Sequence, residues 1–277
     1  MGQITSYTEV SELVNNNVFL IDGPSGTKKI SAENLLYALL DQLGTINHRR
    51  IFRGKYLGAS FTSEQKSAIQ NGTFKDLWLG DYWTMNGVNY RIVDIDYWYG
   101  KGDTPCTTHH VVVMPDANMV SSKMQNSDTT QRGYIGTLPV QSVLGTLRST
   151  VLTAFGSDSL LLHRGYFIDA MNSYYPVGGN WYDSRMEVPS EHMIFGCPVT
   201  GITNPGNISI GLAKSDTTQL ALFDVDPHFI ASGNTYWLRD TVNSSQYSAV
   251  DGVGTATKAN ASQTLDIRPV FGIKGAA

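Results

Sequence analysis

The chain has 277 residues and a formal net charge of −4; 41% of its residues are hydrophobic and 16% are charged. This length holds one large domain or one domain with an appendage. A negative charge without a basic run argues against nucleic acid as a partner. No apolar run approaches the roughly 20 residues that cross a bilayer, and the N-terminus lacks the basic start and apolar run of a secretory signal. We therefore expect a protein that is made in a cytoplasm and does not enter a membrane.

The first 46 residues have the pattern of an attachment segment. Residues 18–21 form a short apolar run that ends in a turn at residues 22–26, and Ser31 and Gly44 suit the cap and the stop of a helix. Leucines recur within this helix at spacings of three and four, which makes one apolar stripe. The stripe consists of Leu35, Leu36, Leu39, Leu40 and Leu43. It either packs on the rest of the chain or associates with other copies in a short helical bundle, and we assign its leucines to oligomerisation.

Residues 47–277 are predicted to form one domain. Thr62 and Gln65 have the spacing of a capping box, and Gly72 suits the stop of that helix. The pair Asn86-Gly87 lies between two apolar runs and predicts a β-hairpin. A further strand is expected at residues 110–114.

The second half of the chain supplies another helix and three more strands. Residues 143–155 place four apolar side chains on one helical face before Gly156. The expected strands cover residues 235–239, 247–250 and 267–273. The predicted fold class is therefore α+β, with two helices and a mainly antiparallel sheet in the larger domain.

A polar segment separates the last two apolar runs. Residues 241–265 carry only two charged side chains, Asp251 and Lys258. Because loops of small polar residues on a rigid scaffold commonly form binding surfaces, we expect this segment to be exposed and to bind a ligand. Tyr247 is its expected anchor. The predicted ligand-binding residues are Asn243, Ser244, Ser245, Gln246, Tyr247, Asp251, Thr255, Thr257, Asn260 and Ser262.

Two arginines stand beside apolar neighbours near this segment. A buried guanidinium must be matched by an acidic or polar group. We therefore predict that Arg239 and Arg268 are structural, with Asp240 and Asp266 as their partners.

Residues able to act as ligands or catalysts are few. Asp103, Cys106, His109 and His110 form one cluster, but adjacent histidines on a strand point to opposite faces, so a structural role is expected. Two acidic pairs, Asp94 with Asp96 and Glu187 with Glu191, occur at a frequency that chance explains. The sequence also lacks a Gly-x-Ser-x-Gly elbow, a phosphate-binding glycine loop and a His-Glu-x-x-His motif.

We accordingly expect no catalytic residue, no metal and no cofactor. Cys106 and Cys197 are the two cysteines; they fit no zinc spacing. They are either joined by one bridge or, as we expect, separate buried thiols.

The C-terminal motifs resemble those of a known group. Tyr236-Trp237-Leu238-Arg239, a polar segment and then Arg268-Pro269-Val270-Phe271 are similar to the C-terminus of C-type-lectin-fold virion proteins of bacteriophages, which include tropism-determinant receptor-binding proteins. The run Leu77-Trp78-Leu79-Gly80-Asp81-Tyr82-Trp83 looks like a phage and gut-bacterial domain that shares this ending. The resemblance covers roughly residues 52–274 and, more weakly, the first 45.

This resemblance implies a display domain on a virion, often trimeric, with the first segment contacting other virion proteins. It implies a receptor-binding or fibre adhesin that recognises a host or mucosal glycan or protein and is assembled in a bacterial cytoplasm. A capsid decoration or head-fibre protein is the alternative, and a glycan-active enzyme is the third. The calcium-binding triplets of sugar-binding lectins are absent from the sequence, so calcium-dependent sugar binding is not expected.

Overall fold

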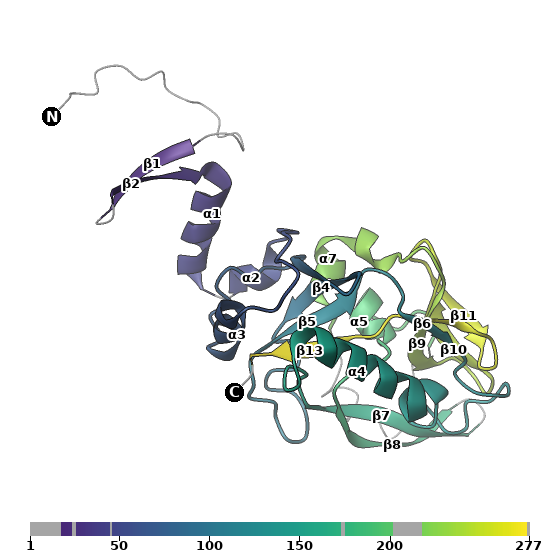
Figure 1. Ribbon diagram of the computed structural model, residues 1–277. Helices are drawn as coiled ribbons and strands as arrows, with labels where there is room; N and C mark the ends of the chain where they lie inside the picture. The colour runs from purple at the N-terminus through teal and green to yellow at the C-terminus, as the bar shows by residue number, and fades with distance from the viewer. Residues whose placement is uncertain (1–17, 24–25, 45, 173–174, 202–217, 276–277) are drawn as a thin grey trace. The chain divides into compact units, whose positions relative to one another are not determined.

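A computed structural model describes residues 18–23, 26–44, 46–172, 175–201 and 218–275 of the chain. The chain divides into two compact units, Met1–Asn47 and His48–Ala277 (Figure 1). Each unit is described by itself below. Among the described residues, no helix combines the length and apolar character needed to span a bilayer.

The first unit is a β-hairpin followed by a helix. Strands β1 (Val18–Gly23) and β2 (Gly26–Ser31) pair antiparallel, and α1 (Ala32–Leu40) continues into a short 3-10 turn, η1 (Asp41–Leu43). The Ser31 hydroxyl accepts a hydrogen bond from the Asn34 N–H, which confirms the predicted N-cap. The strand β2 had no sequence prediction. None of the described side chains of α1 is fully buried.

The larger unit opens with two predicted features that the structure confirms. After α2 (Ile46–Arg50), Thr62 and Gln65 form a complete capping box at the start of α3 (Ser63–Gln70). Strands β3 (Tyr82–Met85) and β4 (Val88–Ile95) are joined at Asn86 and Gly87, both of which have positive φ, as a tight hairpin turn requires. The predicted third strand is β5 (His110–Pro115).

The predicted amphipathic helix is α4 (Leu144–Phe155), which follows a π-helical turn, η2 (Pro139–Val143). Its buried side chains are the four that the sequence indicated: Leu144, Leu147, Val151 and Phe155. Like α2, further short helical elements in the described part of this unit were not predicted. They are α5 (Glu191–Phe195), α7 (Ala221–Val225) and η4 (Pro227–Ile230).

The described strands of the larger unit form two multi-stranded sheets and one long hairpin. The four-stranded sheet has the order β13-β5-β4-β3, and the five-stranded sheet has the order β11-β10-β9-β12-β6. The remaining strands are β6 (Val120–Ser122), β7 (His163–Asn172), β8 (Tyr175–Ser184), β9 (Tyr236–Thr241), β10 (Gln246–Val250), β11 (Ala256–Asn260), β12 (Leu265–Ile267) and β13 (Phe271–Lys274). Among the described strand pairs, only β9 and β12 run parallel, so the predicted α+β class with mainly antiparallel pairing is confirmed.

The last predicted strand is divided in two. Residues 265–267 pair in the five-stranded sheet, whereas residues 271–274 pair in the four-stranded sheet. Pro269 lies between them, and proline cannot donate a hydrogen bond to a neighbouring strand. The hairpin β7–β8 and the strand β11 were also not predicted.

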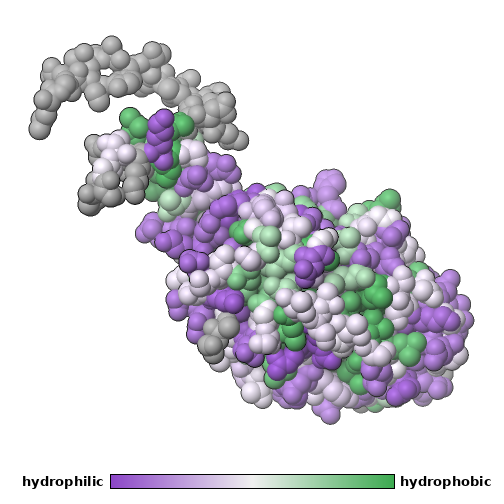
Figure 2. All heavy atoms as spheres, in the orientation of Figure 1, coloured by the Kyte–Doolittle hydropathy of each residue, from purple (hydrophilic) through white to green (hydrophobic). Residues whose placement is uncertain are grey.

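Both sheets of the larger unit bury side chains on two faces. Alternate residues of β5 belong to different core clusters: Val111 and Val113 to one, Val112 and Met114 to the other. The helix α4 covers the first cluster, and α5 and α7 cover the second. Figure 2 shows hydrophilic, intermediate and hydrophobic residues intermixed on the face of the larger unit that is in view.

Candidate functional site

A chain of polar side chains lies at one end of the β10–β11 hairpin. We name it the amide network; its members are Asp128, Asn243, Ser245, Gln246, Asn260 and Ser262. The Asn243 side-chain amide donates to the side-chain carbonyl of Gln246 over 2.8 Å, and the Gln246 side-chain amide donates to the side-chain carbonyl of Asn260 over 3.0 Å. The Asn260 amide in turn donates to Asp128 over 3.1 Å. Each amide is therefore oriented by its neighbour.

Strand pairing explains why these residues meet. Gln246 and Asn260 are directly opposite each other in the antiparallel register of β10 and β11. At the turn before β10, the Ser245 N–H and hydroxyl both donate to the Asn243 side-chain carbonyl. After β11, the Ser262 N–H and hydroxyl donate to Asp128 over 3.0 and 2.6 Å. Hydrogen bonds from Ser245 and Ser262 therefore fix the side chains at the two ends of the network, Asn243 and Asp128.

A loop that is distant in the sequence, residues 130–133, is hydrogen-bonded to the end of the hairpin that carries the network. The Thr130 N–H donates to the Ser244 carbonyl, and the Thr130 hydroxyl donates to the Asn243 carbonyl over 2.7 Å. The Tyr247 hydroxyl donates to the Gly133 carbonyl over 2.9 Å. These bonds connect the end of the hairpin to residues 130–133, so the polar groups are held on a rigid base.

The prediction that Tyr247 is an exposed anchor is wrong. Tyr247 has no exposed surface and packs edge-on against Trp237, with ring centroids 6.5 Å apart. Strand β10 lies between β9 and β11, so its alternate side chains enter the core. Burial accordingly raises the pKa of the Tyr247 phenol. Residues 247–250 are all buried, and segment 241–265 forms a strand pair where the sequence predicted a displayed loop.

Four other predicted ligand-binding residues lie in three places outside the network. Ser244 is exposed at the turn beside the network. Asp251 and Thr255 lie at the opposite end of the hairpin, where the Asp251 carboxylate accepts hydrogen bonds from the Val253 and Thr255 N–H groups. Thr257 is half-buried in β11. The structure therefore brings five of the ten predicted residues into one network and adds Asp128, for which the sequence carried no signal.

The electrostatics of the network are simple. Its side chains are neutral apart from Asp128, an exposed carboxylate whose pKa is lowered chiefly by hydrogen bonds from Ser262. Amide, hydroxyl and carboxylate groups at fixed positions suit a ligand rich in hydroxyl groups or exposed peptide groups. The Ser262 hydroxyl donates to the Asp128 carboxylate, but the same carboxylate also accepts the Ser262 N–H and the Asn260 amide, and the network contains no histidine, so its arrangement favours binding over catalysis.

The predicted oligomerisation leucines differ in exposure. Leu36 is 53% exposed and Leu39 is 58% exposed, whereas Leu35 and Leu40 are half-buried. The side chain of Leu43 lies outside the described residues. On the hairpin of the same unit, Val18 and Leu20 are 56% and 70% exposed, and they share one strand face because alternate residues point the same way.

The histidines of the cluster are held by Asp96 and by the backbone. Asp96 lies 2.7 Å from His109 Nδ1 and accepts the His110 backbone N–H over 2.9 Å, whereas the buried His110 ring has its Nδ1 2.9 Å from the Thr108 carbonyl. Burial lowers the pKa of His110 to about 3, so its imidazole is neutral. Asp103 pairs with Arg164. Across the described ranges, no group of three His, Cys, Asp or Glu side chains is placed to hold a metal.

The two cysteines are free thiols. Cys106 is buried, as expected, but Cys197 is exposed, which corrects the prediction of two buried thiols.

Asp94 of the first acidic pair forms an ion pair with Arg49 and also accepts from the Ala221 N–H.

The second acidic pair is structural. Glu187 is fully buried, lies 2.6 Å from His163 Nε2 and forms an ion pair with Arg239. Glu191 is also buried, and its carboxylate accepts the N–H groups of residues 199–201 and the Thr200 hydroxyl. These carboxylates hold distant chain segments together.

Burial of the two arginines is confirmed, but their predicted partners are wrong. Arg239 pairs with Glu187, because adjacent residues of a strand point to opposite faces and Asp240 faces away, accepting the Glu191 N–H. Arg268 donates to the backbone carbonyls of Pro115, Phe229 and Ile230. Asp266 accepts from Asn118 and Ser121.

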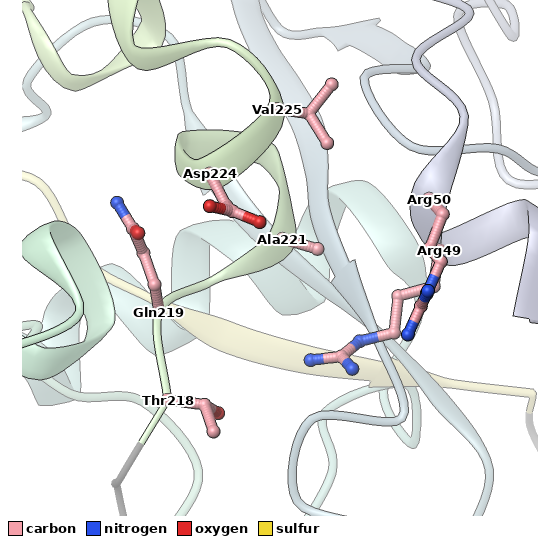
Figure 3. A pocket seen from close by; sticks show the side chains of 7 residues that line it. All are labelled: Arg49, Arg50, Thr218, Gln219, Ala221, Asp224 and Val225. Atoms are coloured by element: carbon pink, nitrogen blue, oxygen red, sulfur yellow. The ribbon is translucent and has the colours of Figure 1, made fainter.

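A separate pocket of about 620 Å³ lies beside α7 (Figure 3). Figure 3 shows Arg49 and Arg50 across the pocket from Gln219 and Asp224. Arg49 is held by Asp94, and Gln219 donates to the Ile194 carbonyl. The lining residues are Arg49, Arg50, Thr218, Gln219, Ala221, Asp224 and Val225. They carry charges of both signs, and none is a histidine or cysteine, so this pocket offers no evident acid–base pair.

Comparisons of the chain with family models, with curated proteins and with solved structures give no match.

Proposed function

We propose that the chain is a bacteriophage virion structural protein whose larger unit is a C-type-lectin-like display domain that binds a host or mucosal glycan or protein. The amide network is its proposed contact surface. The proposal includes no catalysis and no cofactor. It draws the lectin-like fold and the virion setting from the resemblance of the C-terminal motifs.

The observation that carries the proposal is the orientation of the network. Three amides, two hydroxyls and one carboxylate are linked by successive hydrogen bonds. The backbone of Asn243 and Ser244 and the side chain of Tyr247 are in turn bonded to residues 130–133. Groups that are already ordered lose little conformational freedom when a ligand binds. A polar surface of this kind therefore favours recognition even though each contact is weak.

The first unit is proposed to attach the display domain to other virion proteins and to form a homotrimer. All six histidines and both cysteines of the chain lie in the larger unit, so residues 1–47 have neither a disulfide nor a histidine metal ligand to stabilise them. Units shorter than about 70–80 residues rarely gain enough stability from a single core and commonly rely on a crosslink, a metal or a partner. Leu36 and Leu39 supply an exposed apolar stripe for that partner.

The second candidate function is a capsid decoration or head-fibre protein that mainly binds the viral shell. The exposed Val18, Leu20, Leu36 and Leu39 favour it, since they would suit a shell protein as well as a second copy. Several display domains on one particle would then still gain avidity from weak single sites.

Competition of phage adsorption by the purified full chain tests the proposal. We expect the wild-type chain to block adsorption and Asn260→Ala to block it less, because the substitution disconnects Gln246 from Asp128. Asn180→Ala is the matched control, since Asn180 is exposed on β8 and outside the network. Absence of a block at saturating wild-type protein, or equal blocking by both variants, would contradict the proposed site.

A further inference from the structure

A row of aromatic side chains lies in the larger unit, outside the amide network. We name it the aromatic row; its members are the rings of Phe52, Tyr56, Tyr82 and Phe229, together with the guanidinium of Arg91 that contacts two of them. The rings of Tyr56 and Tyr82 have centroids 5.6 Å apart, and those of Phe52 and Phe229 are also 5.6 Å apart. The guanidinium of Arg91 connects the two ring pairs, because it lies 4.7 Å from the Tyr82 ring centre and 4.6 Å from that of Phe229.

Two glycines allow Phe52 to lie directly on the backbone. A Cβ atom placed on Gly80 would come within 2.2 Å of the Phe52 ring, and one placed on Gly54 within 2.9 Å. The ring therefore occupies the space that side chains at these positions would need. Its residue is still 37% exposed, and Tyr56 is 50% exposed. The row thus offers accessible aromatic surface, and the inner face of the Phe52 ring is packed against the backbone.

The polar groups of the row are already ordered. Arg91 donates to both carboxylate oxygens of Asp116, over 2.6 and 2.7 Å, and to the Gly80 carbonyl over 2.6 Å. This bidentate geometry immobilises the guanidinium between the two rings. Because Asp116 balances the charge of Arg91, the row is close to neutral.

We infer that the aromatic row is a binding face for a neutral saccharide. The flat apolar faces of sugar rings match accessible aromatic rings, and their hydroxyls can reach the half-buried carboxylate of Asp116 at the edge of the row. A nucleic acid is disfavoured because Asp116 neutralises the only cation of the row and the chain carries a net charge of −4.

This inference goes beyond the proposed function, since it uses different residues and requires no virion. The experiment screens the full chain against immobilised neutral oligosaccharides and then titrates the best binder. We expect Phe52→Leu and Tyr56→Ala each to weaken binding by about tenfold or more, as removal of a packed ring should. Phe52→Leu keeps apolar cover over Gly80, so loss of binding would not merely report loss of folding.

Tyr99→Ala is the matched control, because Tyr99 is 44% exposed and stacks on His109 instead of the row. It should leave saccharide affinity unchanged, as should Asn260→Ala in the amide network. The inference is overturned if no neutral oligosaccharide binds. It is also overturned if Phe52→Leu and Tyr56→Ala bind as the wild type does, or if only anionic glycans or proteins are captured. Loss of binding with Asn260→Ala alone would support the amide network and contradict the aromatic row.

Discussion

The ion pair between Arg239 and Glu187 gives the sharpest prediction about stability. Both side chains are buried, with Glu187 1% and Arg239 7% exposed. Replacing Arg239 by methionine keeps an apolar side chain over the Phe167 ring, whose centre lies 4.9 Å from the guanidinium. It leaves Glu187 in contact with the imidazole of His163, whose Nε2 lies 2.6 Å from the carboxylate.

The expected cost follows from the uncompensated carboxylate. Removing one partner of a buried ion pair destabilises a protein by about 3–5 kcal/mol. Folded proteins are typically stable by only about 5–15 kcal/mol, so the variant should remain folded with a large loss of stability. Arg132→Met is the matched control, because Arg132 is exposed, and it should change the unfolding free energy by about 0.5 kcal/mol or less.

The pH dependence identifies the cause. Burial raises the pKa of Glu187, but Arg239 and His163 lower it by more, so its pKa in the folded protein lies below the ordinary value. The wild-type pair therefore stabilises the fold at neutral pH, and this contribution is lost as the pH falls through that lowered pKa. Without Arg239, burial dominates and the pKa rises above its unfolded value. The cost of Arg239→Met should thus be largest at neutral pH and shrink as the pH falls toward 4.

Urea unfolding followed by tryptophan fluorescence, at pH 7 and in steps down to pH 4.5, measures both quantities. A loss below about 1 kcal/mol at pH 7 would refute the reasoning, because the carboxylate would then have found solvent or another partner. A cost that grows toward acidic pH would refute it equally.

Three further predictions concern other parts of the chain. Thr62→Ala removes the capping box of α3 and should lower the unfolding free energy by about 1 kcal/mol in urea titrations; an unchanged midpoint would contradict the cap's role. Burial and then the Glu191 charge raise the pKa of Asp240 to about 6, so the contribution of Asp240 to stability should fall as the pH rises from 4 to 6, and Asp240→Asn should remove it; an equal slope in both proteins over this range would argue against it. Leu36→Glu with Leu39→Glu should reduce an oligomer to a 30.4 kDa monomer by analytical ultracentrifugation, whereas Val253→Glu, at a residue 81% exposed in the larger unit, should not; a wild-type monomer would contradict self-association.

Several local features were predictable because their causes lie within a few residues. The capping box at Thr62 needs only a hydroxyl and a glutamine three positions later. The turn at Asn86 and Gly87 needs two residues that tolerate positive φ. The buried face of α4 follows from the spacing of its apolar residues. The combination of two predicted helices with several short predicted strands was also enough to predict the α+β class.

The candidate site was predictable only in part. Polarity marked Asn243, Gln246 and Asn260 as members of one surface, but it marked Tyr247 in the same way. The side chain of Tyr247 points inward because β10 pairs on both sides, and pairing with β9 and β11 is a property of the assembled sheet. Asp128 and Ser262 are 134 positions apart in the sequence, so no local pattern could predict their contact.

Spacing along the chain by itself determined the helix caps, the tight turn and the apolar faces, because these depend on bonds and periodicities within one or two turns of backbone. The tertiary structure alone decided that Arg239 meets Glu187 instead of its neighbour Asp240, and that Arg91 is placed between Tyr82 and Phe229. A buried charge takes whichever partner the packing brings within reach, and strand geometry turns adjacent residues to opposite faces.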